Sequence, residues 1–578
     1  MMGKRRCSNL AYIWWMLLSS IALTDGVTAQ VNVDAANASR FIDHSLLISP
    51  ELPCTWPTAP FPRFQLTHQR VIGPESNYNV DVLLIDGNTG TQLDVPPHSV
   101  ARPELKREKS GPLGLAYTDQ IEAWQFGGEA CVVDVRDLLD KAPKGESPLV
   151  KREHVERFEK QFRKVRFGDV VLFRSDYTDK FYRPFPEGNR FIADALDRKS
   201  PGYPDPDPEC MEFLATRGVM TLGTDSASMG PLPDLAEPTH YAGLKHGMIW
   251  TESATNLGSL PPTGAFYCML GPKHQGGPYG EGRAFSIVGG DLPKQLTDAA
   301  KSKRVIDLSP TLSPNMPIAS PGNSTGLHRQ AYLKIDFLYS EYLDMWHHAH
   351  MMDAMAGTHL VPPSYALPPT GANPAYAPEA RGWLEEYEKA YGPRGTSSMT
   401  TEQVPLEWTS GSVRILDVRS LIGSTNKNAW PASPDVTPDL IKKFESRAGE
   451  LRSGEVVLLH TGHIDKYFKA PTAGDGMWTD PLKGKTEGWP AMGADAVKYL
   501  KSKGIRCVAT DAPDLGGVDP KRALMTYWAL GSSEMVGVEF LSNVKNVTDG
   551  NYFVFVPLKI QHCHGGPGRA IAYKVNEK

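Results

Sequence analysis

The chain has 578 residues, which is too long for one hydrophobic core and suits two large domains. Hydrophobic residues make up 40% of it and charged residues 22%, as in ordinary globular proteins. The net charge of −5, with no basic cluster beyond the first residues, excludes the electrostatic footprint of a nucleic-acid-binding protein.

The N-terminus predicts a signal peptide over residues 1–29. Lys4-Arg5-Arg6 precede an apolar run from about Leu10 to Leu23, and Val27-Thr28-Ala29 offers small residues for cleavage. The run is short for a membrane span, so we expect cleavage and a secreted protein, periplasmic or extracellular, with no membrane association afterwards. An uncleaved membrane anchor is the alternative that the residues leave open. Secretion permits disulfides among the six remaining cysteines, but the chain is not cysteine-dense enough to need them.

The rest of the chain contains one domain-sized pattern twice. Gly168-Asp169-Val170-Val171-Leu172-Phe173 returns as Gly454-Glu455-Val456-Val457-Leu458-Leu459, and Ile42-Asp43-His44-Ser45 returns as Ile306-Asp307-Leu308-Ser309. The period is much longer than that of a solenoid repeat, so we predict a tandem duplication. The first copy covers residues 40–296 and the second copy residues 305–578, and we interpret residues 297–303 as a short polar linker.

Both copies alternate two kinds of segment. The apolar, β-branched runs Val170–Phe173 and Val456–Leu459 predict buried strands. Residues Lys151–Lys164 and Ala494–Lys503 have a helical period and are rich in charge, which predicts surface helices. Strands that alternate with helices indicate the α/β class.

One stretch of the first copy combines metal-ligand side chains with turn residues: Asn88-Thr89-Gly90-Thr91-Gln92-Leu93-Asp94-Val95-Pro96-Pro97-His98. Gln92 and Asp94 are two residues apart, so they share one face of an extended strand. A turn and two prolines could fold Asn88 and His98 back onto that face. Such oxygen and nitrogen ligands suit Zn²⁺ or Mn²⁺, whereas a glycine–proline turn with a capped aspartate is the alternative that the residues alone leave open.

This stretch resembles the H-x-G-T-H-x-D-x-P-x-H motif of the metal-dependent cyclase family, the kynurenine formamidase and isatin hydrolase type. His240, followed by Glu252 twelve residues later, matches the second part of the family's ligand set. The chain departs from the motif at Asn88 and Gln92, which replace histidines. The resemblance implies one Zn²⁺ or Mn²⁺ ion. Its ligands would be Gln92, Asp94, His240 and Glu252, with Asn88 peripheral.

The resemblance also implies a reaction, the hydrolysis of a C–N bond in a small amide, formamide or lactam. The ion would activate water and polarise the carbonyl group, while His98 would act as general acid and base. Glu252 would either bind the metal or take the proton of the water. Arg174, Tyr177 and Lys180 follow a predicted strand and would either orient the substrate or form a solvated loop.

The second copy has lost this ligand pattern. Met355 stands at the first ligand position, no aspartate follows Gly357-Thr358-His359, and Tyr527 replaces the histidine twelve residues before Glu539. We therefore expect no family metal there. The segment Trp346-His347-His348-Ala349-His350 offers a different metal site through His348 and His350, or ordinary loop and core histidines.

The second copy has a predicted structural role. Members of the family resemble obligate homo-oligomers whose active sites lie near the subunit interface. We therefore expect two tandem swivelling β/β/α domains of the cyclase type that form an intrachain pseudo-dimer, with or without a further homodimer. In this arrangement Trp346 or Tyr365 would reach the pocket of the first copy.

Two other functions stay open. A secreted pseudoenzyme would bind a small ligand without turnover, which Asn88 and the altered second copy favour. A metal-dependent lyase or cyclase would use the same ion and His98 on an oxygenated substrate. Metal content separates the enzyme from the pseudoenzyme, and a panel of amides separates the hydrolase from the lyase.

Overall fold

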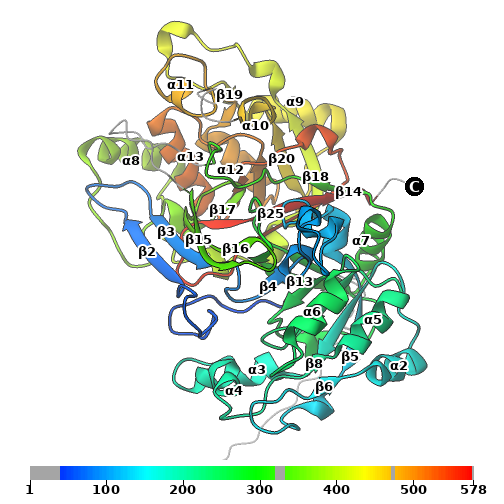
Figure 1. Cartoon of the computed structure of the whole chain (residues 1–578). Coiled ribbons are helices and arrows are strands. Elements are labelled where there is room, and N and C mark those ends of the chain that lie inside the picture. The colour runs from blue at the N-terminus through cyan, green and yellow to red at the C-terminus, as the bar shows by residue number, and fades with distance from the viewer. Residues whose placement is uncertain (1–38, 319–331, 470–475, 576–578) are drawn as a thin grey trace, which may run out of the picture. The chain divides into compact units, whose positions relative to one another are not determined.

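The computed structural model describes residues 39–318, 332–469 and 476–575 (Figure 1). The predicted signal peptide, residues 1–29, lies outside the described residues. Within the described ranges, no helix has the length and hydropathy needed to cross a bilayer.

The first copy is built on a nine-stranded mixed sheet. Its centre is parallel, through β5, β7, β9 and β10, and antiparallel strands complete both sides. Val170, Val171, Leu172 and Phe173 in β7 are buried, which confirms the strand predicted there. In sheet order the strands are β1 (Arg40–Asp43), β13 (Arg283–Val288), β11 (Phe266–Leu270), β5 (Gly127–Asp134), β7 (Asp169–Arg174), β9 (Thr221–Thr224), β10 (Ile249–Glu252), β4 (Gln92–Asp94) and β12 (Tyr279–Glu281).

Amphipathic helices accompany this sheet. Helix α2 turns Val155 and Phe158 inward and its charged residues outward, which confirms the helix predicted from its period. The predicted polar linker is wrong, because residues 297–301 continue helix α7, whose Leu296, Ala299 and Ala300 are buried. Polar residues there form the outer face of an amphipathic helix. The helices of this copy are α2 (Arg152–Gln161), α3 (Tyr177–Phe181), α4 (Ala193–Leu196), α5 (Pro208–Thr216), α6 (Ala236–Leu244) and α7 (Leu292–Lys301).

The second copy is built on an eight-stranded sheet with the same parallel centre. Its strands are β14 (Val305–Asp307), β25 (Gly566–Tyr573), β17 (His359–Val361), β23 (Val536–Glu539), β22 (Cys507–Thr510), β20 (Val456–His460), β18 (Ser410–Asp417) and β24 (Tyr552–Pro557). Its helices are α8 (Pro378–Tyr391), α9 (Pro438–Ala448), α10 (His463–Tyr467), α11 (Thr479–Leu482), α12 (Ala494–Ser502) and α13 (Pro520–Ser532). Strands and helices alternate in both copies, so the predicted α/β class is confirmed.

A four-stranded sheet combines strands from both copies, in the order β15 (Tyr332–Ser340), β16 (Met345–Asp353), β3 (Val80–Asp86) and β2 (Gln65–Arg70). Its central pair is β16 and β3, whose register places Ala349 opposite Asp86. Two small parallel sheets pair β6 (Leu149–Val150) with β8 (Asp205–Pro206) and β19 (Asp435–Val436) with β21 (Ala491–Met492).

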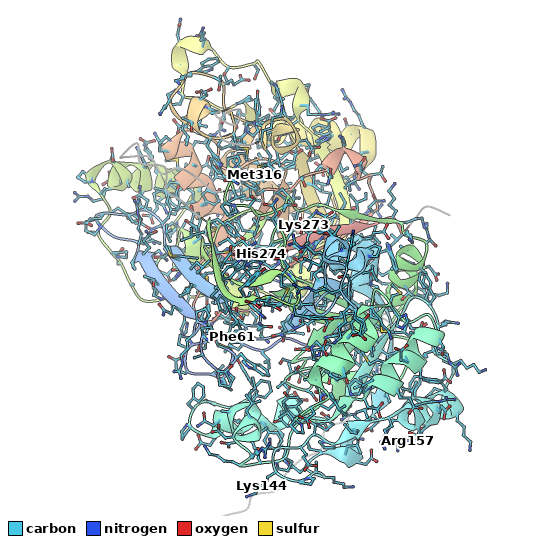
Figure 2. All side chains as sticks on the ribbon, in the orientation of Figure 1. Phe61, Lys144, Arg157, Lys273, His274 and Met316 are labelled. Atoms are coloured by element: carbon cyan, nitrogen blue, oxygen red, sulfur yellow. The ribbon has the colours of Figure 1, made fainter. Side chains whose placement is uncertain are left out.

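The two copies also share buried charge and apolar core. Arg283 Nη2 and Lys559 Nζ both lie 2.9 Å from Asp43 Oδ2. The second copy has the equivalent ion pairs, because Asp307 Oδ2 lies 2.6 Å from Arg569 Nη2 and 2.9 Å from Lys273 Nζ. Lys273 is labelled near the middle of Figure 2. Each aspartate therefore pairs with an arginine of its own copy and a lysine of the other. One apolar cluster joins residues of both large sheets, among them Phe266, Phe285, Val554 and Tyr573.

The six cysteines of the described residues are all free and buried. They therefore form none of the disulfides that secretion would permit, and they behave as small apolar core residues.

The buried histidine at the start of the first copy predicts a loss of stability in mild acid. His44 hydrogen-bonds the Thr255 carbonyl oxygen and the Ser286 hydroxyl, and burial lowers its pKa to about 4. The imidazole of the unfolded chain titrates at about pH 6.5. The contribution of neutral His44 to the free energy of unfolding is therefore fully present above that pH, and it is lost as the pH falls toward 4.

His44→Leu should remove this pH dependence, on the order of 2 kcal/mol between about pH 7 and about pH 4.5. Leu308 is the equivalent residue of the second copy. It is fully buried, and its backbone amide donates to the Ala570 carbonyl oxygen as that of His44 donates to the Ala284 carbonyl oxygen. Urea unfolding of both proteins at the two pH values measures the effect. Equal slopes of stability against pH would contradict it.

Candidate metal centre

The site is organised around the short strand β4. The register of β4 and β10 places Gln92 opposite Glu252, and Asp94 opposite Trp250. On the other side of β4, β12 places Tyr279 opposite Asp94. Side chains alternate along a strand, so Gln92 and Asp94 point to one face while Leu93 packs in the core. The shared face predicted from the sequence is therefore present.

The turn after β4 brings His98 back to Asp94. Pro96 and Pro97 occupy the first positions of the 3-10 turn η1 (Pro96–His98), where the fixed φ of proline is suited to the turn. His98 Nε2 consequently lies 3.7 Å from Asp94 Oδ2.

Helix α6 supplies the second histidine. His240 Nδ1 donates a hydrogen bond to the Ala236 carbonyl oxygen one turn earlier, at 2.7 Å. This bond fixes the ring, so that Nε2 lies 3.4 Å from Asp94 Oδ2 and 3.5 Å from Glu252 Oε1. The rings of His98 and His240 are 5.3 Å apart.

Hydrogen bonds orient Glu252 and Gln92. Glu252 Oε1 accepts from the Met229 amide at 2.7 Å, and Oε2 accepts from Gln92 Nε2 at 2.9 Å. Gln92 Nε2 also donates to Asn88 Oδ1 at 3.0 Å. Both hydrogens of the Gln92 amide group are donated in these two bonds, which leaves its carbonyl oxygen as the atom that can bind a metal ion. The structure brings all six predicted site residues together, with Asn88 at the edge, where it holds Gln92.

The site carries buried negative charge. The side chains of Asp94 and Glu252 are 0% and 3% exposed. Burial and the Asp94 carboxylate raise the pKa of Glu252. Burial alone would lower the pKa of His240, but its bonds to Asp94 and Glu252 outweigh this effect and raise the pKa well above its ordinary value. Two buried carboxylates need a cation, which a proton on His240 supplies in part.

The donor atoms fit a divalent metal ion. Ligand atoms of Asp94, His98 and His240 all lie within 4.8 Å of one another. Among the described residues, buried Asp94 Oδ1 and His98 Nδ1 have no hydrogen-bond partner. Imidazole and carboxylate ligands suit zinc and similar borderline ions. Asp94, His240 and Glu252, with the carbonyl oxygen of Gln92, would hold such an ion beside His98.

The second copy contributes a residue that the sequence analysis missed. The Tyr279 hydroxyl is hydrogen-bonded to His347 Nδ1 at 2.7 Å, and the His347 ring lies 6.4 Å from that of His98. Trp346, proposed for this role, is instead exposed against Tyr339. Alternation along β16 explains the difference, because neighbouring residues point to opposite faces of the sheet.

The other proposed contributor, Tyr365, lies at the altered site of the second copy. It stacks on Tyr78 of the first copy at 4.8 Å and meets Tyr527 edge to face. There Glu539 Oε1 accepts from the Tyr527 hydroxyl at 2.7 Å and from the Leu515 amide at 2.9 Å, while His359 Nε2 lies 3.1 Å from Oε2. The Tyr527 hydroxyl thus donates a hydrogen bond to the carboxylate oxygen that a metal ion would need as its ligand.

For two further groups of side chains, the structure favours the non-catalytic alternative that the sequence left open. His348 and His350 do not share a metal cluster, because His348 bonds Asp336 while His350 bonds the Tyr332 hydroxyl. Tyr177 is fully buried and bonds the backbone oxygen of Phe191, so it cannot orient a substrate. Arg174 and Lys180 are paired with acidic side chains, as in a solvated loop.

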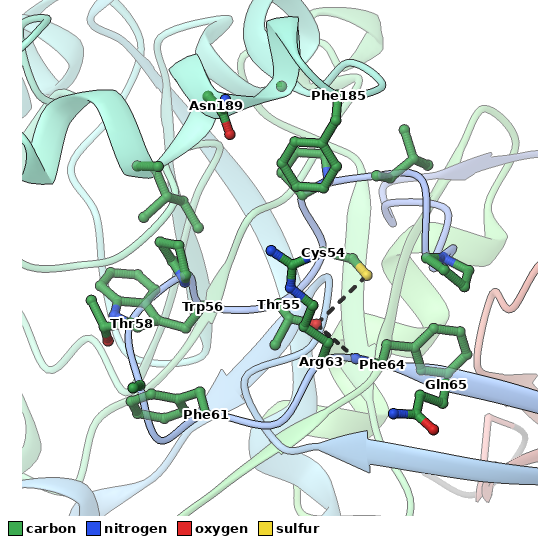
Figure 3. Close-up of a pocket in the computed structure, with 18 residues that line it drawn as sticks. Cys54, Thr55, Trp56, Thr58, Phe61, Arg63, Phe64, Gln65, Phe185 and Asn189 are labelled. Carbon is green, nitrogen blue, oxygen red and sulfur yellow. Dashed lines mark hydrogen bonds between the residues drawn. The ribbon is translucent and has the colours of Figure 1, made fainter.

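A cavity of about 500 Å³ (Figure 3) is lined by residues of the first copy that include none of the six candidate site residues. The Phe61 ring, which lines it, is 5.8 Å from the ring of His347. Polar side chains also line it, namely Thr55, Thr58, Arg63, Gln65 and Asn189. Its aromatic lining residues are Trp56, Phe61, Phe64 and Phe185.

Comparison with known proteins identifies the family. The family model described as Cyclase matches residues 42–231 and again residues 306–516. Isatin hydrolase of Roseibium aggregatum is 31% identical over 196 residues, which cover 31% of this chain and 72% of that protein. Kynurenine formamidase of Salinibacter ruber is 28% identical over 221 residues, which cover 38% of this chain and 84% of that protein.

Solved structures of the same kind match about half of the chain. Isatin hydrolase A from Labrenzia aggregata, bound to benzyl benzoate, is 20% identical with a TM-score of 0.36, over 45% of this chain and 96% of that one. An isatin hydrolase bound to the product analogue thioisatinate is 22% identical with a TM-score of 0.36, over 49% and 97%. The two family-model segments together span well over half of the sequence. The chain belongs to the Cyclase family, as a tandem duplication whose second copy has lost the ligand pattern.

Proposed function

We propose that this protein is a metal-dependent hydrolase of a C–N bond in a small amide, formamide or lactam. The observation that carries the proposal is the convergence of Asp94, His98 and His240 within 4.8 Å, beside buried Glu252. A Zn²⁺ or Mn²⁺ ion bound there would supply Lewis acidity, which polarises a carbonyl group and makes water acidic. The names of the two relatives, isatin hydrolase and kynurenine formamidase, support this class of reaction.

His98 is the group that we assign to proton transfer. Burial and the neighbouring His240 lower its pKa to about 3, so the ring is neutral at physiological pH. The Glu252 carboxylate acts in the opposite direction and would stabilise the imidazolium that forms when His98 accepts a proton. Water adds to the amide carbon, His98 accepts the proton that water loses, and the same proton passes to the departing nitrogen as the C–N bond breaks. Tyr279 and His347 pack around the ring and hold it in place.

His98→Gln should separate proton transfer from metal binding. If His98 moves the proton, kcat falls by about 10²–10⁴-fold while the bound metal stays at the wild-type level. Metal analysis and steady-state kinetics on the same preparation make the measurement. Loss of metal and turnover together would assign His98 to the ligand set and contradict its proposed role.

We propose that the substrate carries an aromatic or apolar group that occupies the cavity beside His347. The aromatic wall of that cavity and the names of the relatives support this substrate class. Phe61→Ala should raise KM by about 10-fold with little change in kcat, because the side chain contacts a part of the substrate that does not react. Ile422→Ala, an exposed residue elsewhere, is the matched control. An unchanged KM would place the substrate outside this cavity.

We also propose that the chain is secreted and that its copies form an intrachain pseudo-dimer of swivelling β/β/α domains. The N-terminal pattern supports secretion. The pairing of β3 with β16 and the reciprocal ion pairs of Asp43 and Asp307 support the internal pairing. The mass of the folded protein in solution tests whether a further homodimer forms.

The altered residue Asn88 supports one alternative, a pseudoenzyme that binds a small ligand. The side-chain oxygen of Asn88 accepts a hydrogen bond from Gln92, and an amide oxygen is a weaker metal ligand than the imidazole of a histidine. Turnover of any amide in a panel that includes aryl formamides and fused lactams would support the hydrolase. Bound metal without amide turnover would favour a lyase or cyclase, and the absence of both would favour the pseudoenzyme.

A further inference from the structure

A second group of possible metal ligands lies away from the candidate centre. Strands β2 and β3 pair so that His68 lies directly opposite Asp81. His68 Nδ1 is 2.7 Å from Asp81 Oδ1, and His564 Nδ1 is 3.0 Å from Asp81 Oδ2. One carboxylate thus lies between two imidazoles, one from each copy.

The arrangement has the features of a built site. The Asp81 side chain is 0% exposed, whereas that of His68 is 43% exposed and gives access from solvent. The backbone amide of His564 donates to Asp81 Oδ2 at 2.6 Å and fixes the carboxylate. Metal ligands are commonly oriented by such hydrogen bonds from outside the ligand set.

The ligand chemistry fits zinc. The three ligand atoms lie within 4.8 Å of one another. Tetrahedral bonds of about 2.0 Å would place them about 3.3 Å apart, so small rotations of the two rings are sufficient. Two imidazoles and a carboxylate, with solvent at the fourth position, form a set that zinc and copper ions favour over magnesium or calcium.

The same sheet contains an internal comparison. Across β15 and β16, His348 Nδ1 lies 2.7 Å from Asp336 Oδ1, the same separation as in the pair His68–Asp81. This pair belongs to none of the possible metal clusters among the described residues. The second imidazole of His564 therefore distinguishes one histidine–aspartate pair from the other.

We propose that His68, Asp81 and His564 form a Zn²⁺ site, separate from the candidate centre. The site joins the β2–β3 hairpin of the first copy to the loop between β24 and β25 of the second copy. An ion that binds only when these segments are together favours the folded chain. Because β2 begins at Gln65, which lines the cavity, the ion would also hold one cavity wall in place.

Zinc stoichiometry tests this assignment. The purified chain is stripped with a chelator, equilibrated with a small molar excess of Zn²⁺, and analysed for metal per chain. His68→Gln should bind one equivalent less than the wild type, and because the side chain is partly exposed the substitution leaves the core packing unchanged. Asp336→Asn, in the matched pair without a second imidazole, should bind as much as the wild type.

The result is independent of the proposed catalytic site. Asp94→Ala removes the other equivalent, so a chain without catalytic metal would still lose one equivalent on His68→Gln. A double variant, His68→Gln with His564→Gln, covers the case in which two ligands retain the ion. Wild-type stoichiometry in both the single and the double variant would overturn the proposal.

Discussion

Glu252→Gln should lower kcat/KM by at least about 100-fold. The substitution removes a proposed metal ligand, and this should cost more than the roughly 10–100-fold that is typical when a residue that only hydrogen-bonds a ligand is changed. The substitution keeps the size of the side chain and removes one of two buried negative charges beside His240. The remaining charge attracts a divalent cation less strongly. Steady-state kinetics with the best amide of the panel measures the loss.

The second copy supplies the matched control. Glu539 ends β23 as Glu252 ends β10, and it is equally buried. In Glu539→Gln the amide oxygen can still accept from Leu515 and Tyr527, and its N–H can face His359. We expect turnover within about twofold of the wild type, since the site around Glu539 has no predicted part in the chemistry. Equal losses in both variants would contradict the division of roles between the copies.

Arg569→Met should destabilise the fold by about 3 kcal/mol, the lower end of the range for breaking a buried ion pair. Arg569 is 1% exposed and pairs with Asp307, while Lys273 partly compensates that carboxylate. Burial alone would raise the pKa of Asp307, but Arg569 and Lys273 lower it, so the carboxylate stays charged. The variant leaves that charge with one cation, and chemical unfolding measures the loss.

An exposed ion pair gives the comparison. Arg152 and Glu156 lie one turn apart on α2, with side chains 48% and 43% exposed. Arg152→Met should change the free energy of unfolding by no more than about 0.5 kcal/mol, because water already solvates both charges. Similar effects of Arg569→Met and Arg152→Met would show that the buried pair adds no specific stability to the fold.

Much of each copy could be predicted because its signals are local. The runs Val170–Phe173 and Val456–Leu459 are apolar and begin with β-branched valines, so their composition alone indicates the buried strands that the structure contains. Residues 297–303 show the limit of such reasoning. Their polarity suggested a linker, but half of an amphipathic helix is polar, and the buried Ala299 and Ala300 extend α7.

The central residues of the candidate site could be predicted from the sequence for the same reason. Gln92 and Asp94 share a face by strand geometry, and the spacing of His240 and Glu252 matched a known family pattern. Tyr279 and His347 were missed because their contact joins positions that are far apart in the sequence. The pairing of β16 with β3 creates that contact, and no local signal specifies which exposed edges of two duplicated copies will pair.

Metal content per chain, compared between the wild type and Asp94→Ala, tests the central claim most directly. The wild type should hold one Zn²⁺ or Mn²⁺ more than the variant, and that difference should persist when His68 is glutamine. Such a result would locate the catalytic ion in the first copy. Identical metal content in the two proteins, after reconstitution with either ion, would contradict a metal centre at Asp94 and with it the proposed hydrolase.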